Sequence, residues 1–214
     1  SDELRFFLAV VAFSTLLISI NIWPMYPADG SAVRHAAFQV GSIISTTGFA
    51  STDFNLWPEF SRILLVLLMF IGACAGSTGG GIKCSRVLML LRAIRREIHQ
   101  IAHPRSVEVV KLDGKVAEES TVHSVLVFVG CYGLILLGAA LVVSLDKMPF
   151  DVSFSAALTC LSNVGPGLAA IGPTGNFSGF SDLSKLALSL CMIVGRLEIF
   201  PILVMFSART WRRD

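Results

Sequence analysis

Residues 45–49, with the sequence STTGF, decide the fold because they end an apolar segment that is too short to cross a membrane. That segment covers Ser31–Ser45 and lies between a long apolar stretch at 4–23 and another that begins at Arg62. A half-length helix that ends in small residues and glycine is how membrane proteins line a pore with backbone carbonyls. We therefore expect a re-entrant half-helix followed by a pore-lining turn.

The same arrangement occurs a second time. A short apolar segment at Phe150–Leu161 is followed by SNVGPG (residues 162–167). Pairing Gly48 with Gly165 gives an offset of 165 − 48 = 117, and this offset also pairs Thr46-Thr47 with Asn163-Val164. Pro166 should stiffen the exit from the second turn. Long apolar stretches flank the two short segments, at 4–23, 62–71, 121–145 and 183–208.

The repeat predicts an all-α integral membrane protein made of two helix–pore-loop–helix repeats. We expect the first repeat at 1–102, with an intramembrane loop at 72–83. A cytoplasmic connector at 103–120 should lead to the second repeat at 121–214. The stretch at 4–23 has close to the ~20 residues that a helix needs to cross the hydrocarbon.

Composition supports lipid as the main solvent. Of the 214 residues, 54% are hydrophobic and 15% are charged, and the mean hydropathy is +0.73. An ordinary soluble domain has about 25% charged residues. The five cysteines are scattered without a CxxC pair, which predicts neither a disulfide framework nor a metal site. The sequence contains no nucleophile–base arrangement, so we do not expect an enzyme.

The basic residues cluster between the apolar stretches. Eight of the 17 Lys and Arg residues lie between Lys83 and Lys115, and three more lie in the tail at 209–213. Nucleic-acid binding is not indicated because aromatic residues do not alternate with the basic ones. The positive-inside rule accounts for the cluster. We therefore expect residues 83–120 and both termini in the cytoplasm, with a tight turn at Asp113-Gly114.

A glycine-rich run interrupts the apolar stretch that begins at Arg62. Its pattern differs from a nucleotide-binding P-loop because Ile82 separates the last glycine from Lys83. Small residues at this depth are tolerated beside a water-filled cavity, so we interpret the run as a flexible intramembrane loop near the pore. A helix kink for packing is the alternative. The residues of the loop are Gly76, Ser77, Thr78, Gly79, Gly80 and Gly81.

Arg196 lies inside the last apolar stretch. An arginine at this depth is costly, so it should face the bundle interior or water. Glu198 follows by two residues, and a helix would point it in another direction. Arg196 could present positive charge to a conduction path, or it could form a packing ion pair with no role in conduction.

Taken together, these stretches resemble the TrkH branch of the TrkH/KtrB potassium transporters. The resemblance rests on TTGF at 46–49, on the run at 72–83, on NVGPG at 163–167 and on GRLEIF at 195–200. Members of that family have four pore repeats around one pore, and this chain resembles the third and fourth, the C-terminal half. The resemblance implies that the glycine-rich loop is the gate and that Arg196 is an electrostatic barrier. It implies a K⁺ filter formed by Thr46, Thr47, Gly48, Asn163, Val164 and Gly165, with Thr46, Thr47, Asn163 and Val164 as the metal (K⁺) ligands.

The resemblance also implies what the chain works with. It implies potassium uptake across the bacterial inner membrane, with K⁺ as the transported ion and no other cofactor. The expected partners are membrane lipid, the missing N-terminal half of the same polypeptide, a second copy in a homodimer, and a cytosolic nucleotide-binding regulatory ring like TrkA. Two alternatives remain open. One is permeation of Na⁺ or of both ions, and the other is a non-conducting scaffold or sensor that docks cytosolic partners through its basic segment.

Overall fold

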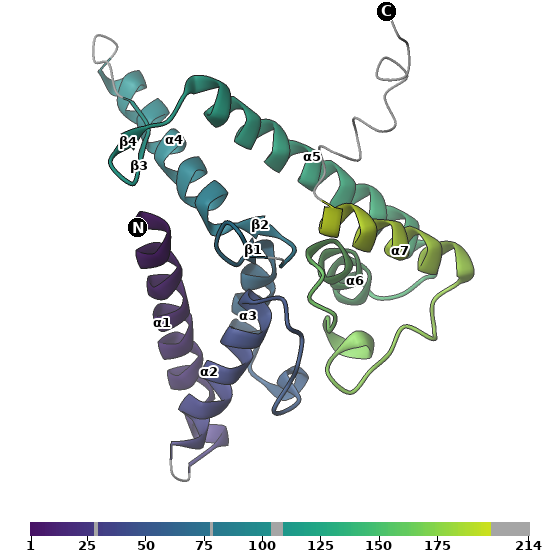
Figure 1. The fold of residues 1–214 in the computed structure, drawn as a ribbon. Coiled ribbons are helices and arrows are strands. Elements are labelled where there is room, and N and C mark those ends of the chain that lie inside the picture. The colour runs from purple at the N-terminus through teal and green to yellow at the C-terminus, as the bar shows by residue number, and fades with distance from the viewer. Residues whose placement is uncertain (28–29, 78, 104–108, 198–214) are drawn as a thin grey trace, which may run out of the picture.

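The computed structural model describes residues 1–27, 30–77, 79–103 and 109–197, and the fold is almost entirely helical (Figure 1). The α-helices of these residues are α1 (Asp2–Ile22), α2 (Ser31–Ile44), α3 (Glu59–Phe70), α4 (Cys84–Ala102), α5 (Glu119–Ser144), α6 (Phe150–Ser162) and α7 (Asp182–Leu197). Short 3₁₀ turns occur at η1 (Trp23–Met25), η2 (Phe54–Leu56) and η3 (Ala169–Ile171). The strands are β1 (Ile71–Gly72), β2 (Ile82–Lys83), β3 (Lys111–Leu112) and β4 (Lys115–Val116).

Helix lengths agree with the predicted pattern at 4–23 and 121–145 but not for the stretch that begins at Arg62, because α3 has only 12 residues and ends just before the glycine-rich run. Among the described residues, Asp2–Met25 and Glu119–Ser144 are helical, long and apolar enough to cross a membrane, judged by length and composition. The intervening helices α2 and α6 have 14 and 13 residues. At about 1.5 Å per residue they reach only about 20 Å, less than the ~30 Å of the hydrocarbon. The predicted end of the last stretch, like Thr78 and Glu198, lies outside the described residues.

The short helices begin and end at residues that favour those positions. Helix α2 begins directly after Gly30, whose φ of 67° is left-handed, and α6 begins after Pro149. At its other end α6 is terminated by Asn163, which also adopts a left-handed conformation. Asparagine tolerates this conformation better than most residues, which is why it ends helices. The local sequence therefore sets where the second half-helix stops.

One hydrophobic core joins the two halves of the chain. Figure 1 shows α1, α2 and α3 grouped together, α6 and α7 packed beneath α5, and α4 extending away toward the start of α5. Helices α3 and α6 are in contact and connect these groups. Buried residues of this core include Ile43, Leu65, Leu158, Leu161 and Val164. Helix α6 thus lies in the interior, whereas α2 buries one face and leaves Val33 and Phe38 about half exposed.

Two pairs of very short strands complete the fold. The pair β3–β4 is antiparallel and is joined by the predicted turn at Asp113-Gly114, where both residues have positive φ. The pair β1–β2 is parallel and was not predicted. It joins the two ends of the glycine-rich segment, so the break between α3 and α4 is closed by backbone hydrogen bonds. Strands of two residues carry no periodicity that a sequence could reveal.

Candidate functional site

The two glycine turns adopt the same backbone conformation at the positions that the offset of 117 pairs. Thr46 and Asn163 both have φ of 56°, and Gly48 and Gly165 have φ of 78° and 111°. Glycine adopts positive φ at little cost, and asparagine tolerates it. A β-branched threonine in this region is strained, by about 1–3 kcal/mol. The surrounding structure therefore holds the first turn in its conformation.

Hydrogen bonds around the turns follow the same register. Three bonds of the first turn, two of the backbone and one of a side chain, have a counterpart 117 residues further on. The bond from Thr46 N to Ile43 O (3.0 Å) matches the one from Asn163 N to Cys160 O (3.2 Å). The bond from Thr47 N to Ser42 O (2.9 Å) matches the one from Val164 N to Thr159 O (3.0 Å). The side-chain bond from Ser42 Oγ to Phe49 O (2.5 Å) matches the one from Thr159 Oγ1 to Pro166 O (2.9 Å).

Ser42 and Thr159 are site residues that the sequence reasoning missed. Each hydroxyl donates to a carbonyl on the far side of its own turn, and so ties the end of the half-helix to the exit of the turn. Thr159 Oγ1 also accepts a hydrogen bond from Gly165 N at 2.9 Å. The signal was present, because the offset of 117 pairs two hydroxyl residues at these positions. Extending the comparison four residues upstream of Thr46 would have found it.

The two turns touch each other at Gly48. A Cβ placed on Gly48 would lie 2.1 Å from Val164 O and 3.1 Å from Pro166 Cδ, which leaves no room for a side chain. Gly48 is therefore required both by its positive φ and by the approach of the second turn. The first turn is in this way brought beside the second turn at Val164 and Pro166. The assignment of Thr46, Thr47, Gly48, Asn163, Val164 and Gly165 to a filter stays a prediction.

The glycine-rich loop lies against the start of both turns. A Cβ placed on Gly79 would lie 2.8 Å from Thr46 Oγ1, and one placed on Gly80 would lie 2.2 Å from Ser162 O. Glycine is thus needed at these two positions because the loop closely approaches the ends of α2 and α6. The sequence-based interpretation as a flexible loop did not include this reason. Ser77 Oγ accepts a hydrogen bond from Gly79 N at 3.2 Å and braces this part of the loop.

The ends of the loop are held by residues from distant parts of the chain. Cys84 Sγ donates to Gly72 O at 3.2 Å beside the β1–β2 pair. Glu3 Oε1 accepts hydrogen bonds from Ala75 N at 2.6 Å and from Ser85 N at 3.1 Å. Glu3 thereby caps the positive end of α4 and anchors the loop to α1. This role could not be predicted from a local pattern, because the contacting amides are more than 70 residues away in the chain.

Residues after the turns form a second cluster on the other side of the site. They line a hollow of about 700 Å³, to which residues 48–53, 165–166 and 171–177 contribute. Beside it, the Asn55 carboxamide holds Ala169 at two points, since Nδ2 donates to Ala169 O at 3.1 Å and Oδ1 accepts from Ala169 N at 2.9 Å. The two turns therefore lie between this hollow and the glycine-rich loop.

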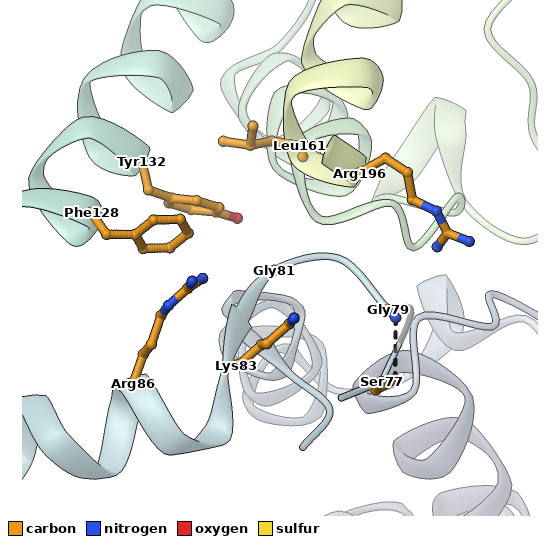
Figure 2. A pocket seen from close by; sticks show the side chains of 10 residues that line it. Ser77, Gly79, Gly81, Lys83, Arg86, Phe128, Tyr132, Leu161 and Arg196 are labelled. Atoms are coloured by element: carbon orange, nitrogen blue, oxygen red, sulfur yellow. Dashed lines mark hydrogen bonds between the residues drawn. The ribbon is translucent and has the colours of Figure 1, made fainter. Parts of the chain in front are cut away.

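A smaller cavity of about 70 Å³ lies beside the loop, and three cationic side chains line it (Figure 2). Arg196 comes from α7, whereas Lys83 at the end of β2 and Arg86 in the first turn of α4 lie on the opposite wall. Phe128 and Tyr132 of α5 form the apolar part, and the Arg86 guanidinium lies 4.0 Å from the centre of the Phe128 ring. Arg196 is thus one of the residues that line a cavity, and its role as a charge barrier stays a prediction. Glu198 lies outside the described residues.

Contacts at α7 and α5 fix the second turn. Asn163 Nδ2 donates to Met192 O at 3.2 Å, and Tyr132 Oη forms a buried hydrogen bond of 2.7 Å with Ser162 Oγ. A Cβ placed on Gly195 would lie 1.9 Å from Leu161 O, so α7 packs against the end of α6 at a glycine. Among the described residues, no group of three His, Cys, Asp or Glu side chains could hold a metal ion.

An all-α membrane fold with two half-helices, paired pore-type turns and a cationic cavity defines the class of the protein as a membrane transport protein. Residues 6–213 match the family model of TrkH, described as a cation transport protein, and the chain belongs to this family. The family is one of transporters and not of enzymes.

Known relatives and a solved structure agree with this assignment. The chain is 35% identical to the Trk system potassium uptake protein TrkG of Escherichia coli (strain K12), over 98% of this chain and 43% of that protein. It is 32% identical to TrkH of the same strain, over 98% of this chain and 44% of that protein. The crystal structure of the potassium transporter TrkH from Vibrio parahaemolyticus superposes with a TM-score of 0.89 at 34% identity, and covers 98% of this chain and 45% of that one. The chain thus spans less than half the length of these relatives.

Proposed function

We propose that this chain supplies two of the filter segments of a potassium-uptake pore. The observation that carries the proposal is the pair of matched turns that touch at Gly48 and Val164, between a hollow on one side and the glycine-rich loop on the other. Dehydrated K⁺ needs several oxygens in place of its water shell, and backbone carbonyls provide them. The carbonyls of Thr46, Thr47, Asn163 and Val164 are the proposed ligands, with Gly48 and Gly165 allowing the turns to form.

The loop and Arg196 are proposed to control passage on the inner side. Gly79 and Gly80 lie against the bases of the two turns, which is where a gate can stop an ion that has left the filter. Movement of the run Gly76–Gly81 would open this path. Arg196, at the cavity beside the loop, would place a positive charge near the exit and oppose cation entry.

The rest of the pore is proposed to come from outside this chain. Two turns supply half of the filter expected for a family with four repeats, and the relatives are more than twice as long as the matched region. We therefore propose that the chain acts as the C-terminal half of an uptake subunit in the bacterial inner membrane. In that setting residues 83–120 face the cytoplasm, a second copy forms a homodimer, and a nucleotide-binding ring docks on the cytosolic side.

Uptake by the full-length protein in a host that lacks potassium uptake tests the proposal. Gly48→Ala should abolish growth on low potassium and Rb⁺ uptake, because its Cβ would collide with Val164 O. Gly138→Ala in α5 is the matched control, since nothing lies within 4 Å of its Cβ position in this chain. Adding Na⁺ as a competitor separates K⁺ selectivity from mixed permeation. Wild-type flux in Gly48→Ala would contradict the filter assignment.

The scaffold alternative makes a different prediction at the basic helix α4. Arg92 is bonded to Asp2 at 2.9 Å and Arg96 to Glu119 at 2.7 Å, so part of the basic surface serves contacts within the chain. Charge reversal at either residue would therefore disturb the fold as well as any docking. Arg95→Glu is the cleaner variant, and under the scaffold alternative it alone should abolish function while Gly48→Ala should not.

A further inference from the structure

Asn163 ends the second half-helix and reaches a different helix with its side chain. Its carboxamide nitrogen donates to Met192 O of α7 at 3.2 Å. In an α-helix the carbonyl of one residue accepts the amide hydrogen of the residue four positions later. Met192 O is therefore the carbonyl of the helical turn that ends at Arg196. The Asn163 side chain acts on the turn of α7 that carries the arginine.

A second contact fixes the same turn of α7. A Cβ placed on Gly195 would lie 1.9 Å from Leu161 O and 2.8 Å from Asn163 Nδ2. Only a glycine permits the backbone of α7 to approach the end of α6 so closely. The residue next to Gly195 is Arg196, so its Cα is set by the contact between α6 and α7. The two interactions together connect the base of the second turn to the position of the arginine.

The equivalent residue of the first turn has a different neighbour. Thr46 has the same φ of 56° as Asn163 and the same backbone hydrogen bond, but its hydroxyl lies against Gly79 of the glycine-rich loop. The two turns therefore use the same register position to contact two different parts of the proposed inner exit. This difference makes Thr46 a matched control for the side chain of Asn163.

We infer that Asn163 is a positioning residue for Arg196: its carboxamide holds the α7 turn in register with the second filter turn, while its backbone carbonyl belongs to the filter. The inference rests on the proposed function, because it assigns a route by which the filter and the charged exit affect one another. A change in the second turn moves the arginine, and a displacement of α7 disturbs the second turn. The side chain thus acts through Arg196 and does not bind the ion.

A double-mutant cycle in the full-length protein tests the inference through the maximal rate and the half-saturating concentration of Rb⁺ uptake. Asn163→Gly keeps the left-handed backbone and removes the carboxamide. It should change the maximal rate roughly fivefold, as expected for the loss of one hydrogen bond. The change should have the same direction as that of Arg196→Ala, and the double variant should equal Arg196→Ala alone. Asn163→Ala, which removes the carboxamide without adding charge, should behave as Asn163→Gly does if the glycine variant is poorly produced.

Thr46→Gly provides the control cycle, because it removes a side chain at the equivalent position that does not bond to α7. Its effect should add to that of Arg196→Ala. Additive effects of Asn163→Gly and Arg196→Ala, or a wild-type rate in both Asn163 variants, would overturn the inference. Failure of the proposed function gives a distinct result, in which the unmodified protein supports no Rb⁺ uptake or Gly48→Ala leaves uptake unchanged.

Discussion

The Glu3 carboxylate at the start of α1 accepts a hydrogen bond from the Ala75 amide of the glycine-rich segment at 2.6 Å. The same oxygen accepts from Ser85 N at the start of α4, so one side chain contacts both the glycine-rich segment and α4. An ionised acceptor makes each bond stronger than a neutral one. The loop is therefore held at its base by α1 as well as by the β1–β2 pair.

Loss of the Glu3 carboxylate should loosen the loop. Glu3→Ala removes both bonds, worth about 1 kcal/mol or more each. We expect the neighbouring thiol of Cys74, which is half-buried, to react with a maleimide several-fold faster. Glu3→Gln keeps a neutral acceptor and should show a smaller increase. A Cys74→Ser variant gives the background from the other cysteines, and an unchanged Cys74 rate in Glu3→Ala would disprove the anchor.

Gly80→Ala should disrupt the contact between the loop and the second half-helix. Its Cβ would lie 2.2 Å from Ser162 O, a backbone atom that cannot turn aside. Overpacking of this kind costs typically about 1–3 kcal/mol. We expect a lower midpoint of thermal unfolding in detergent and an altered Rb⁺ uptake rate. Gly130→Ala in α5, where the added Cβ meets nothing within 4 Å in this chain, should leave the midpoint unchanged or raise it.

The two hydroxyls that brace the turns should differ in importance. Thr159 Oγ1 takes part in two hydrogen bonds, with Pro166 O and Gly165 N, whereas Ser42 Oγ bonds to Phe49 O across its turn. At about 1 kcal/mol per bond, Thr159→Val should destabilise the protein about twice as much as Ser42→Ala. Both variants nearly keep the shape of the side chain. Equal losses in unfolding midpoint would show that the second hydrogen bond contributes nothing.

The buried bond between Tyr132 and Ser162 should show strong coupling. Tyr132→Phe leaves the Ser162 hydroxyl without this partner, at a cost of about 1–3 kcal/mol. Ser162→Ala does the same to the tyrosine. The double variant removes both polar groups, so its loss of stability should be much smaller than the sum of the single losses. Chemical denaturation of the four proteins gives the coupling, and additive losses would argue against a direct bond.

Local patterns in the sequence predicted the helices well and the long-range contacts poorly. Apolar length and the glycine turns that follow predict half-helices at Ser31–Ser45 and Phe150–Leu161, within a residue of the observed bounds. The pairing of Gly48 with Gly165 led to the register that the hydrogen bonds follow. Contacts such as Glu3 with Ala75 could not be predicted, because a side chain that accepts from a distant backbone amide leaves no pattern near either partner.

The roles of single residues also differ in whether they can be predicted from the local sequence or depend on long-range contacts. The position of Arg196 beside a cavity follows from the cost of burying a guanidinium in lipid, which can be judged from the sequence. The packing of Gly79 and Gly80 against the turns could not be predicted from the sequence. Small residues that interrupt a helix are compatible with a flexible loop, with a helix kink or with close approach of another segment. Only the three-dimensional structure distinguishes these possibilities.

The matched turns lie on one polypeptide, and their first residues are Thr46 and Asn163. A pore assembled from identical subunits receives every substitution at all of its equivalent positions at once. In this chain the two turns have separate sequences, so a substitution in one turn leaves the other turn unchanged. The two turns can therefore evolve independently. The first turn contacts the glycine-rich loop through Thr46, and the second contacts α7 through Asn163.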